Sequence, residues 1–249
     1  MTKFVFASLI MGLTFIVCQI GFAVDDPTIL WYKFDENFKQ EVEDSSPFGH
    51  IGTVAGSVEF EKEGKIGGAA RFKGGSIKVA ITDELNPEQN MTIEFWVRPD
   101  KVPAATYWRL LHKGWVAAGS YICGIDNNWM VMGYTWDVNN TNNTRTDANM
   151  ANAVQNETWS YYTATYDGKN IILYIDGKEL VKTPTTGKIN GLFEIIIVEG
   201  FLGMMDEIRF SNVALQPEDI AKHMAGETIK AVDSKDKLAT TWSAVKSDI

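Results

Sequence analysis

Cysteine, histidine and basic side chains are all scarce in this sequence. Of its two cysteines, Cys18 falls within an apolar N-terminal run, which leaves Cys123 without a partner for an internal disulfide. The three histidines, His50, His112 and His223, are scattered, whereas zinc sites usually take closely paired ligands. Lysine and arginine number 23 against 32 acidic residues, a net charge of −9, so we expect no nucleic-acid partner. Stability must therefore come from packing, assisted at most by a bound ion.

Long apolar runs are confined to residues 1–23. This segment has one positive charge at Lys3, an apolar stretch to about Ile20, and small residues up to Ala23. That pattern is typical of a secretory signal peptide cleaved near Ala23. A lipoprotein anchored through Cys18 is the alternative, although Val17 stands where a small residue is required. No later run approaches the length of a membrane span, so we expect a mature protein without one, either extracellular or periplasmic.

Short runs of β-branched and aromatic residues, separated by turn residues, fill residues 24–226. The clearest is WSYYTATYDGKNIILYIDGKELV (159–181), where Asp-Gly pairs at 167–168 and 176–177 predict tight hairpins between three strands. Residues 137–157 read as a long polar loop. A short helix is expected at 217–225, followed by a charged tail, 227–249, that either docks or stays mobile. We predict an all-β fold, an antiparallel two-sheet sandwich with one short C-terminal helix.

The central strand MTIEFWVRPD (91–100) contains a carboxylate among aromatic residues. Ile93, Phe95 and Val97 alternate and are expected to face the core, which places Glu94 on the opposite, wetter face. A basic residue on a neighbouring strand is expected to pair with it, with Arg209 and Lys78 as the candidates. The simplest interpretation of Glu94 is therefore structural.

Five blocks of the chain occur in a familiar order. They are LWYKFDE (30–36) with the turn-rich stretch at 44–54, GKIGGAARFKGG (64–75), MTIEFWVRPD, WSYYTATYDGKNIILYIDGKEL (159–180) and FLGMMDEIRFSNVALQPEDIAKHM (201–224). Together they resemble the LamG-like jelly-roll domains, which are laminin G-like members of the concanavalin A-like lectin and glucanase superfamily found in secreted bacterial proteins. The resemblance implies a jelly roll with one concave sheet. It leaves function open, since this fold carries lectins, carbohydrate-binding modules, glycoside hydrolases and adhesion modules.

A hydrolase of the laminarinase type in this superfamily carries E-x-D-x-x-E on one strand, which brings two acids to one groove. The sequence contains no such string. Glu94 is followed two residues later by Trp96, and Glu207 by Arg209, so neither gains a second acid on its face. A G-x-S-x-G nucleophile motif is absent as well. We therefore expect no enzymatic activity.

Aromatic residues crowd into 107–136, beside amides and carboxylates. Sugar binding needs flat aromatic faces and hydrogen-bonding groups, and the expected exposed subset is Trp129, Trp136, Tyr134 and Asn128. The sequence thus favours a secreted, non-catalytic module that binds glycan at a cell surface or in a matrix. The alternative is a protein adhesion or structural module without a sugar site, and a glycoside hydrolase ranks third.

A structural Ca²⁺ is implied by the resemblance, because many relatives hold one through an aspartate on the last strand. Asp206 of MMDEIRF occupies that place, and Asp35 and Asp44 are expected to contribute oxygen ligands. The alternative is that Asp206 accepts backbone N–H bonds at the start of a strand.

Overall fold

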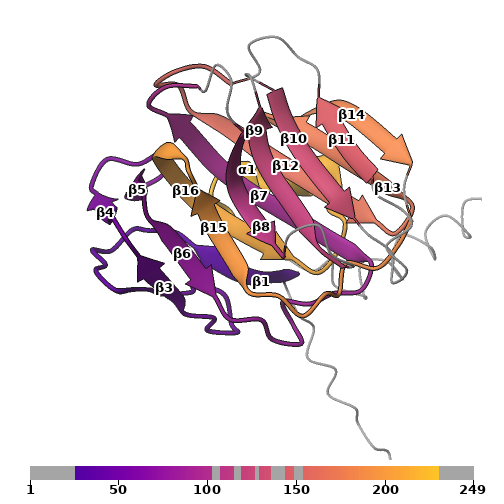
Figure 1. Ribbon diagram of the computed structural model, residues 1–249, viewed down its shortest axis with the longest axis horizontal. Coiled ribbons are helices and arrows are strands. Elements are labelled where there is room, and N and C mark those ends of the chain that lie inside the picture. The colour runs from indigo at the N-terminus through magenta and orange to yellow at the C-terminus, as the bar shows by residue number, and fades with distance from the viewer. Residues whose placement is uncertain are drawn as a thin grey trace, which may run out of the picture.

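The computed structural model describes residues 26–102, 107–114, 119–126, 129–135, 144–148, 154–184 and 186–229. Sixteen strands and one helix lie in these segments, and two antiparallel sheets face each other as a sandwich (Figure 1). The predicted fold class is confirmed. The predicted signal peptide, 1–23, and the tail from residue 230 onward lie outside the described residues.

Sheet A is built around the long strand β16. In spatial order its strands are β14 (Lys178–Pro184), β13 (Asn170–Ile175), β12 (Ser160–Asp167), β7 (Asn90–Pro99), β16 (Leu202–Ser211), β5 (Ala69–Lys73) and β4 (Val58–Glu61). The strand β1 (Thr28–Tyr32) also pairs with β16, beyond the part of β16 that pairs with β5.

Sheet B forms the other layer. Its strands, in spatial order, are β11 (Thr144–Ala148), β10 (Trp129–Thr135), β9 (Tyr121–Asp126), β8 (Tyr107–Lys113), β15 (Ile195–Glu199), β6 (Ser76–Val79), β3 (Gly52–Ala55) and β2 (Glu41–Val42). Alternate residues of both sheets meet in one core, where Ile93, Phe95 and Val97 are fully buried as predicted. The rings of Phe95 and Tyr162 stack across β7 and β12 with centroids 4.7 Å apart.

The two Asp-Gly hairpins form as predicted. Asp176 and Gly177 both have positive φ, 49° and 72°, the backbone that a tight two-residue turn between β13 and β14 requires. At the other turn, the Asp167 carboxylate accepts the backbone N–H groups of Lys169 and Asn170. Local turn chemistry therefore sets the register of β12, β13 and β14.

One strand differs from the sequence-based expectation. The polar stretch 137–157 is predicted to be a loop, yet Thr144–Ala148 forms β11, which pairs with β10. β11 is the edge strand of sheet B and pairs on one side only, and an edge position tolerates polar residues that a central strand would have to bury. Polarity alone is thus a poor guide to secondary structure here.

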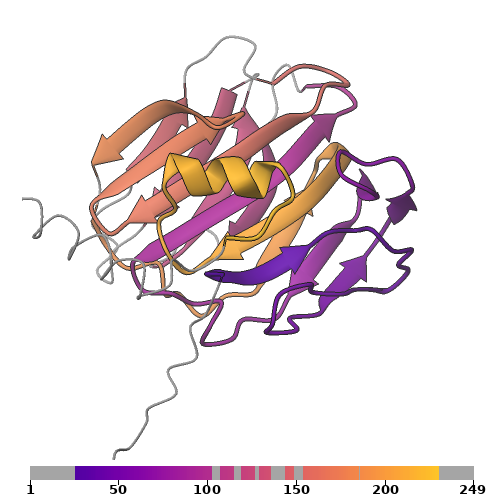
Figure 2. The same ribbon diagram turned by 180° about the vertical axis from the view of Figure 1, so that it is seen from behind.

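The helix α1 (Pro217–Met224) lies across the outer face of sheet A (Figure 2). Pro217 begins it and acidic residues occupy its first turn, as the sequence predicts. It ends before Gly226, whose φ of 79° reverses the chain. On the sheet side, Ile220 packs into a small apolar cluster with Trp96 and Tyr161.

The helix shields this face of sheet A from solvent, so the expectation that Glu94 lies on a wetter face is wrong. Glu94 is fully buried rather than on a wetter face, and His223 of α1 places its Nδ1 2.7 Å from a Glu94 carboxylate oxygen. Arg209 lies opposite Glu94 in the register but binds Glu207, and Lys78 lies in sheet B. The sequence could not show this partner because it comes from a helix 129 positions further along the chain.

The ends of the described body lie together. The Asp26 carboxylate accepts the backbone N–H of Thr28 at 2.9 Å and that of Ile229 at 3.0 Å. Residues 227–229, predicted as the start of the tail, thus belong to the folded body. Within the described segments, no helix has the length and apolar character needed to cross a membrane.

Candidate functional site on the outer face of sheet B

The two sheets differ in what covers their outer faces. α1 lies over sheet A, whereas sheet B turns its outer face towards the viewer in Figure 1, on the side away from α1 (Figures 1 and 2). On this face a hollow of about 560 Å³ opens over β6, β8 and β15. Its lining is Gly74, Gly75, Ser76, Lys78, Arg109, His112, Ile196, Val198, Glu199 and Gly200.

Matched irregularities in two strands bring the charged groups of the hollow to one face. In β8 the consecutive residues Leu110 and Leu111 are both buried in the core, and the register with β9 shifts there. A β-bulge of this kind places Arg109 and His112, three positions apart, on the same outer side. The neighbouring strand β15 has a comparable irregularity at Val198, whose φ is 71°.

The backbone of Val198 is an outlier, because β-branched residues rarely adopt positive φ. Its effect is to aim Glu199 outward, opposite Arg109 in the register between β15 and β8. Strained backbone is found where a particular side-chain direction must be held, and binding sites are the common case. The local geometry therefore marks this hollow as a candidate site.

Two glycines form part of the rim of the hollow, each for a different reason. Gly74 has a φ of 92°, a backbone conformation that favours glycine. Gly75 approaches Ser57 so closely that a Cβ on Gly75 would lie 2.6 Å from the Ser57 backbone nitrogen, so a larger residue would not fit there.

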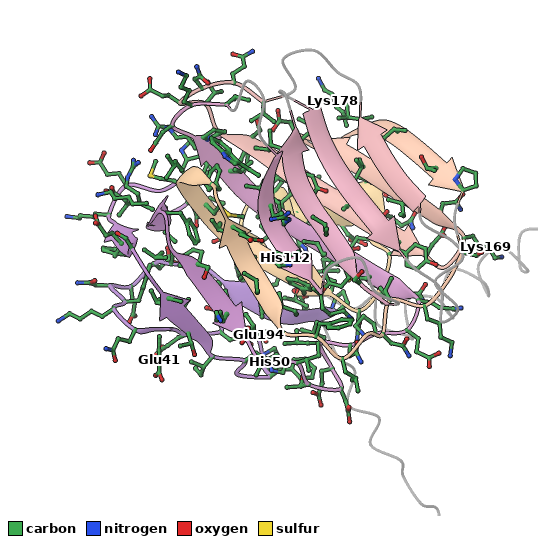
Figure 3. The ribbon with its side chains drawn as sticks, in the orientation of Figure 1. Glu41, His50, His112, Lys169, Lys178 and Glu194 are labelled. Carbon is green, nitrogen blue, oxygen red and sulfur yellow. The ribbon has the colours of Figure 1, made fainter. Side chains whose placement is uncertain are left out.

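The charges in the hollow are partly paired with one another. An Nη1 of Arg109 donates to Glu199 Oε2 at 2.8 Å, and the same oxygen lies 3.4 Å from His112 Nε2. Lys78 lies in the row across β6, β15 and β8 that contains Ile196 and His112, and it pairs with Glu194 at 3.6 Å. Figure 3 looks onto this face, with His112 and Glu194 labelled.

His112 is almost fully enclosed, with 6% of its surface exposed. Burial lowers the pKa of His112 below its ordinary value of 6.5, while Gly114 and Glu199 act in the opposite direction. The imidazole is therefore neutral at pH 7, and the hollow offers one guanidinium donor, a neutral ring and a carboxylate within reach of one another.

Two of the four predicted sugar-binding residues lie in the same sheet. Trp129 and Tyr134 belong to β10, which is separated from β8 only by β9, while their side chains fall outside the described residues. Asn128 and Trp136 lie outside the described residues altogether. These four assignments stay predictions.

Sequence reasoning missed Arg109, His112 and Glu199. The one available signal was the string Arg-Leu-Leu-His at 109–112, in which two adjacent apolar residues break the expected alternation of a strand. Such a break indicates a bulge, and bulges often redirect side chains near functional sites.

The three aspartates predicted to bind calcium do not assemble into one ligand set. Among the described residues no group of three His, Cys, Asp or Glu side chains is placed to hold a metal ion. Asp44 accepts bonds from the backbone N–H of Trp31, Ser46 and His50. Asp35 lines a separate hollow of about 340 Å³ and accepts the N–H of Gly68.

Asp206 is fully buried, and its carboxylate ties a loop to β16. Oδ2 accepts the backbone N–H groups of Lys65 and Ile66, at 2.9 and 2.8 Å, and Oδ1 accepts that of Glu207. Burial raises the pKa of Asp206 to about 7, whereas these N–H bonds oppose the rise. The three N–H bonds correspond to the alternative in which Asp206 accepts backbone hydrogen bonds. A site with one carboxylate and several carbonyls stays a prediction.

We expect Asp206→Ala to lower the free energy of unfolding by about 2 kcal/mol, because three N–H donors lose their acceptor and those of Lys65 and Ile66 can still reach water. Asp206→Asn, which keeps one oxygen for these two donors, should lose about half as much. Urea unfolding followed by tryptophan fluorescence measures both, and repeating it with a chelator tests calcium. Equal stability of wild type and Asp206→Ala would contradict the tie between loop and strand.

Two further acidic residues, which the sequence analysis tested as catalytic candidates, line neither hollow. Glu94 and Glu207 are both fully buried, and His223 of α1 and Arg209 of β16 respectively contact them. Burial raises the pKa of Glu207, and Arg209 and Trp31 act against this rise. Their arrangement fits a structural network between sheet and helix.

Comparison with known proteins gives a family and a set of structural relatives. A family model described as the concanavalin A-like lectin/glucanases superfamily matches residues 73–221, more than half of the chain. No curated protein matches the sequence. Among solved structures, the binding domain of Paraclostridial Mosquitocidal Protein 1 superposes with a TM-score of 0.67 at 15% identity, covering 78% of this chain and 51% of that one.

Two further solved structures carry a named binding partner. The binding domain of botulinum neurotoxin DC in complex with rat synaptotagmin II gives a TM-score of 0.60 at 19% identity, covering 78% of this chain and 50% of that one. Domain 4 of AbnA, an extracellular arabinanase from Geobacillus stearothermophilus, was solved with arabinotriose. It gives a TM-score of 0.58 at 20% identity, covering 80% of this chain and 98% of the domain. The chain thus spans about half the length of the toxin domains, and at these identities the likeness concerns the fold.

Proposed function

Since this chain belongs to the concanavalin A-like lectin/glucanases superfamily, we propose that it is a secreted, non-catalytic module that binds a glycan in the hollow of sheet B. The observation that carries the proposal is the hollow itself, on the face that α1 does not cover. Arg109, His112 and Glu199 converge there above an apolar floor that includes Ile196. Polar groups that fix orientation over apolar contact area are what a sugar site requires.

The structural relatives support a binding role. They are carbohydrate-binding and receptor-binding domains, and the arabinanase domain, which this chain's fold matches over nearly its full length, was solved with a neutral trisaccharide. The partner that we propose is a glycan of a cell surface or matrix, reached outside the cell after removal of residues 1–23. Trp129, on β10 of the same sheet, and Trp136 are proposed to extend the sugar contacts.

The alternative is a module that binds protein. The neurotoxin binding domain, half of which matches this fold, was solved with synaptotagmin II, and Leu192 presents an exposed apolar side chain, 79% accessible, on this protein. A glycan array separates the two functions, because a protein-binding module gives no reproducible glycan signal.

We expect the mature chain to bind neutral oligosaccharides on such an array at pH 7.5, and Arg109→Ala to weaken that binding at least tenfold. The loss of a half-buried, directional donor at the centre of a contact has effects of this size. Glu41→Ala is the matched control, since Glu41 is an exposed residue of the edge strand β2, in the same sheet but outside the hollow.

Trp129→Ala and Trp136→Ala test the predicted aromatic contacts separately. Affinity that survives Arg109→Ala would remove the hollow from the proposal, and affinity that survives both tryptophan variants would remove the aromatic contacts. An array without any binder would reject glycan binding and favour the protein-binding alternative.

A further inference from the structure

The tautomer of His112 is determined by its surroundings. Nδ1 lies 3.3 Å from the backbone oxygen of Gly114. Both ring nitrogens face acceptors, but only Nδ1 has hydrogen-bond geometry and Nε2 makes no hydrogen bond to any described residue, so we place the proton of the neutral ring on Nδ1, where it donates to Gly114. Nε2 then carries a lone pair and acts as an acceptor.

That acceptor faces a second acceptor. His112 Nε2 lies 3.4 Å from Glu199 Oε2 and has no hydrogen-bond partner among the described residues, although the atom is buried. A neutral imidazole nitrogen and a carboxylate oxygen gain nothing from each other without a hydrogen between them. Two acceptors this close together need a hydrogen-bond donor between them, and in a binding site the ligand can supply that donor.

The arrangement is held in place by the backbone. The bulge at Leu110 sets His112 and Arg109 on one face, and the positive φ of Val198 turns Glu199 towards both. Arg109 binds the same Glu199 oxygen at 2.8 Å, so the carboxylate cannot turn away without losing an ion pair. The unsatisfied acceptor is therefore a fixed feature of the site.

We infer that the hollow recognises a hydroxyl group that donates its hydrogen to His112 Nε2, and that protonation of His112 prevents this ligand from binding. The inference rests on the proposed function and specifies its chemistry, namely a neutral polyhydroxylated ligand read by an acceptor. A protonated His112 has a hydrogen on both nitrogens, donates to Glu199, and offers no lone pair to a hydroxyl.

The charges around His112 set the direction of the pH dependence. Glu199 on β15 favours the protonated ring, and Arg109 on β8 disfavours it. Lys78 on β6 lies in the same row and is paired with Glu194. Burial is the largest influence and keeps the ring neutral near pH 7, so the site is open at neutral pH. A bound hydroxyl stabilises the neutral ring further, and affinity should fall about tenfold for each pH unit below the midpoint of the ligand-free protein.

The tautomer can be tested without a ligand. We expect ¹⁵N NMR of the mature chain at pH 8 to show His112 with hydrogen on Nδ1 and a bare Nε2. A spectrum with hydrogen on Nε2 would overturn the inference and leave the proposed glycan binding standing.

Ligand binding supplies the second test, with arabinotriose as the neutral probe and trigalacturonate as its anionic counterpart, titrated calorimetrically from pH 8 to pH 4.5. The wild type should prefer the neutral probe and lose affinity on acidification, while His112→Gln should bind more weakly with a flat pH profile. His50→Gln, a histidine outside the hollow, should keep the wild-type profile. A profile that is flat in the wild type, or a preference for the anionic probe, would contradict the inference, whereas an absence of binding to these probes and to the whole glycan array would instead reject the proposed function.

Discussion

Replacing Arg209 with methionine should lower the free energy of unfolding by about 3–5 kcal/mol, a large share of the stability of an ordinary domain. Arg209 is fully buried on the outer side of β16. One guanidinium nitrogen lies 3.1 Å from Glu207 Oε2, another donates to the backbone oxygen of Glu227 at 2.7 Å, and the group lies 3.6 Å from the centre of the Trp31 ring.

The expected cost comes mainly from Glu207. Without Arg209, its carboxylate stays buried with only the indole N–H of Trp31, 2.7 Å away, as a partner among the described residues. An uncompensated buried charge costs several kcal/mol, whereas the methionine itself fills a comparable volume. Trp31 also loses the cation above its ring, which removes a smaller favourable contribution.

Urea unfolding monitored by circular dichroism measures this loss. The double variant Arg209→Met with Glu207→Gln is the matched control, because it removes both charges and should recover a large part of the lost stability. A single Arg209→Met variant within about 1 kcal/mol of wild type would show that Glu207 already holds a proton in the folded protein.

A second large effect is expected at the helix. We expect His223→Leu to cost about 3 kcal/mol, because it removes the partner that lies 2.7 Å from Glu94 on a fully buried face. The contact of Glu94 with the hydroxyl of Thr163 is long, at 3.5 Å. The apolar Ile220 beside it limits the loss by holding α1 on the sheet.

Hydrogen exchange locates this effect as well as measuring it. Amide protection should fall in α1 and in residues 227–229 while the core strands β7 and β12 keep theirs, since the helix can detach without opening the sandwich. The double variant Glu94→Met with His223→Leu should restore most of the stability. Uniform loss of protection across the core would contradict a helix that releases on its own.

Much of the fold followed from the sequence because its signals are local. The Asp-Gly turns at 167–168 and 176–177, the alternation of Ile93, Phe95 and Val97, and the acidic first turn of α1 each act within a few residues. The polar edge strand β11 was missed because its stability depends on pairing with β10, which composition does not report.

The site was less accessible to sequence reasoning because it depends on register. His112, Ile196 and Lys78 come from three strands that are adjacent only after folding, and Arg109 meets Glu199 through irregularities in two of them. The partner of Glu94 was out of reach for the same reason, since His223 approaches from a helix across the sheet. Trp129 and Tyr134 belong to the sheet that carries the hollow, while the hydrogen-bonding groups of the hollow lie on strands that carried no evident motif.

The Asp26 carboxylate joins the first and last described segments beside α1, on the opposite side of the sandwich from the hollow. The first and last described residues therefore both lie on the side of the module away from the hollow. A tether, a fused domain or a solid support attached there would leave the proposed binding face pointing outward, and attachment at either of these two positions should be equally harmless to ligand capture.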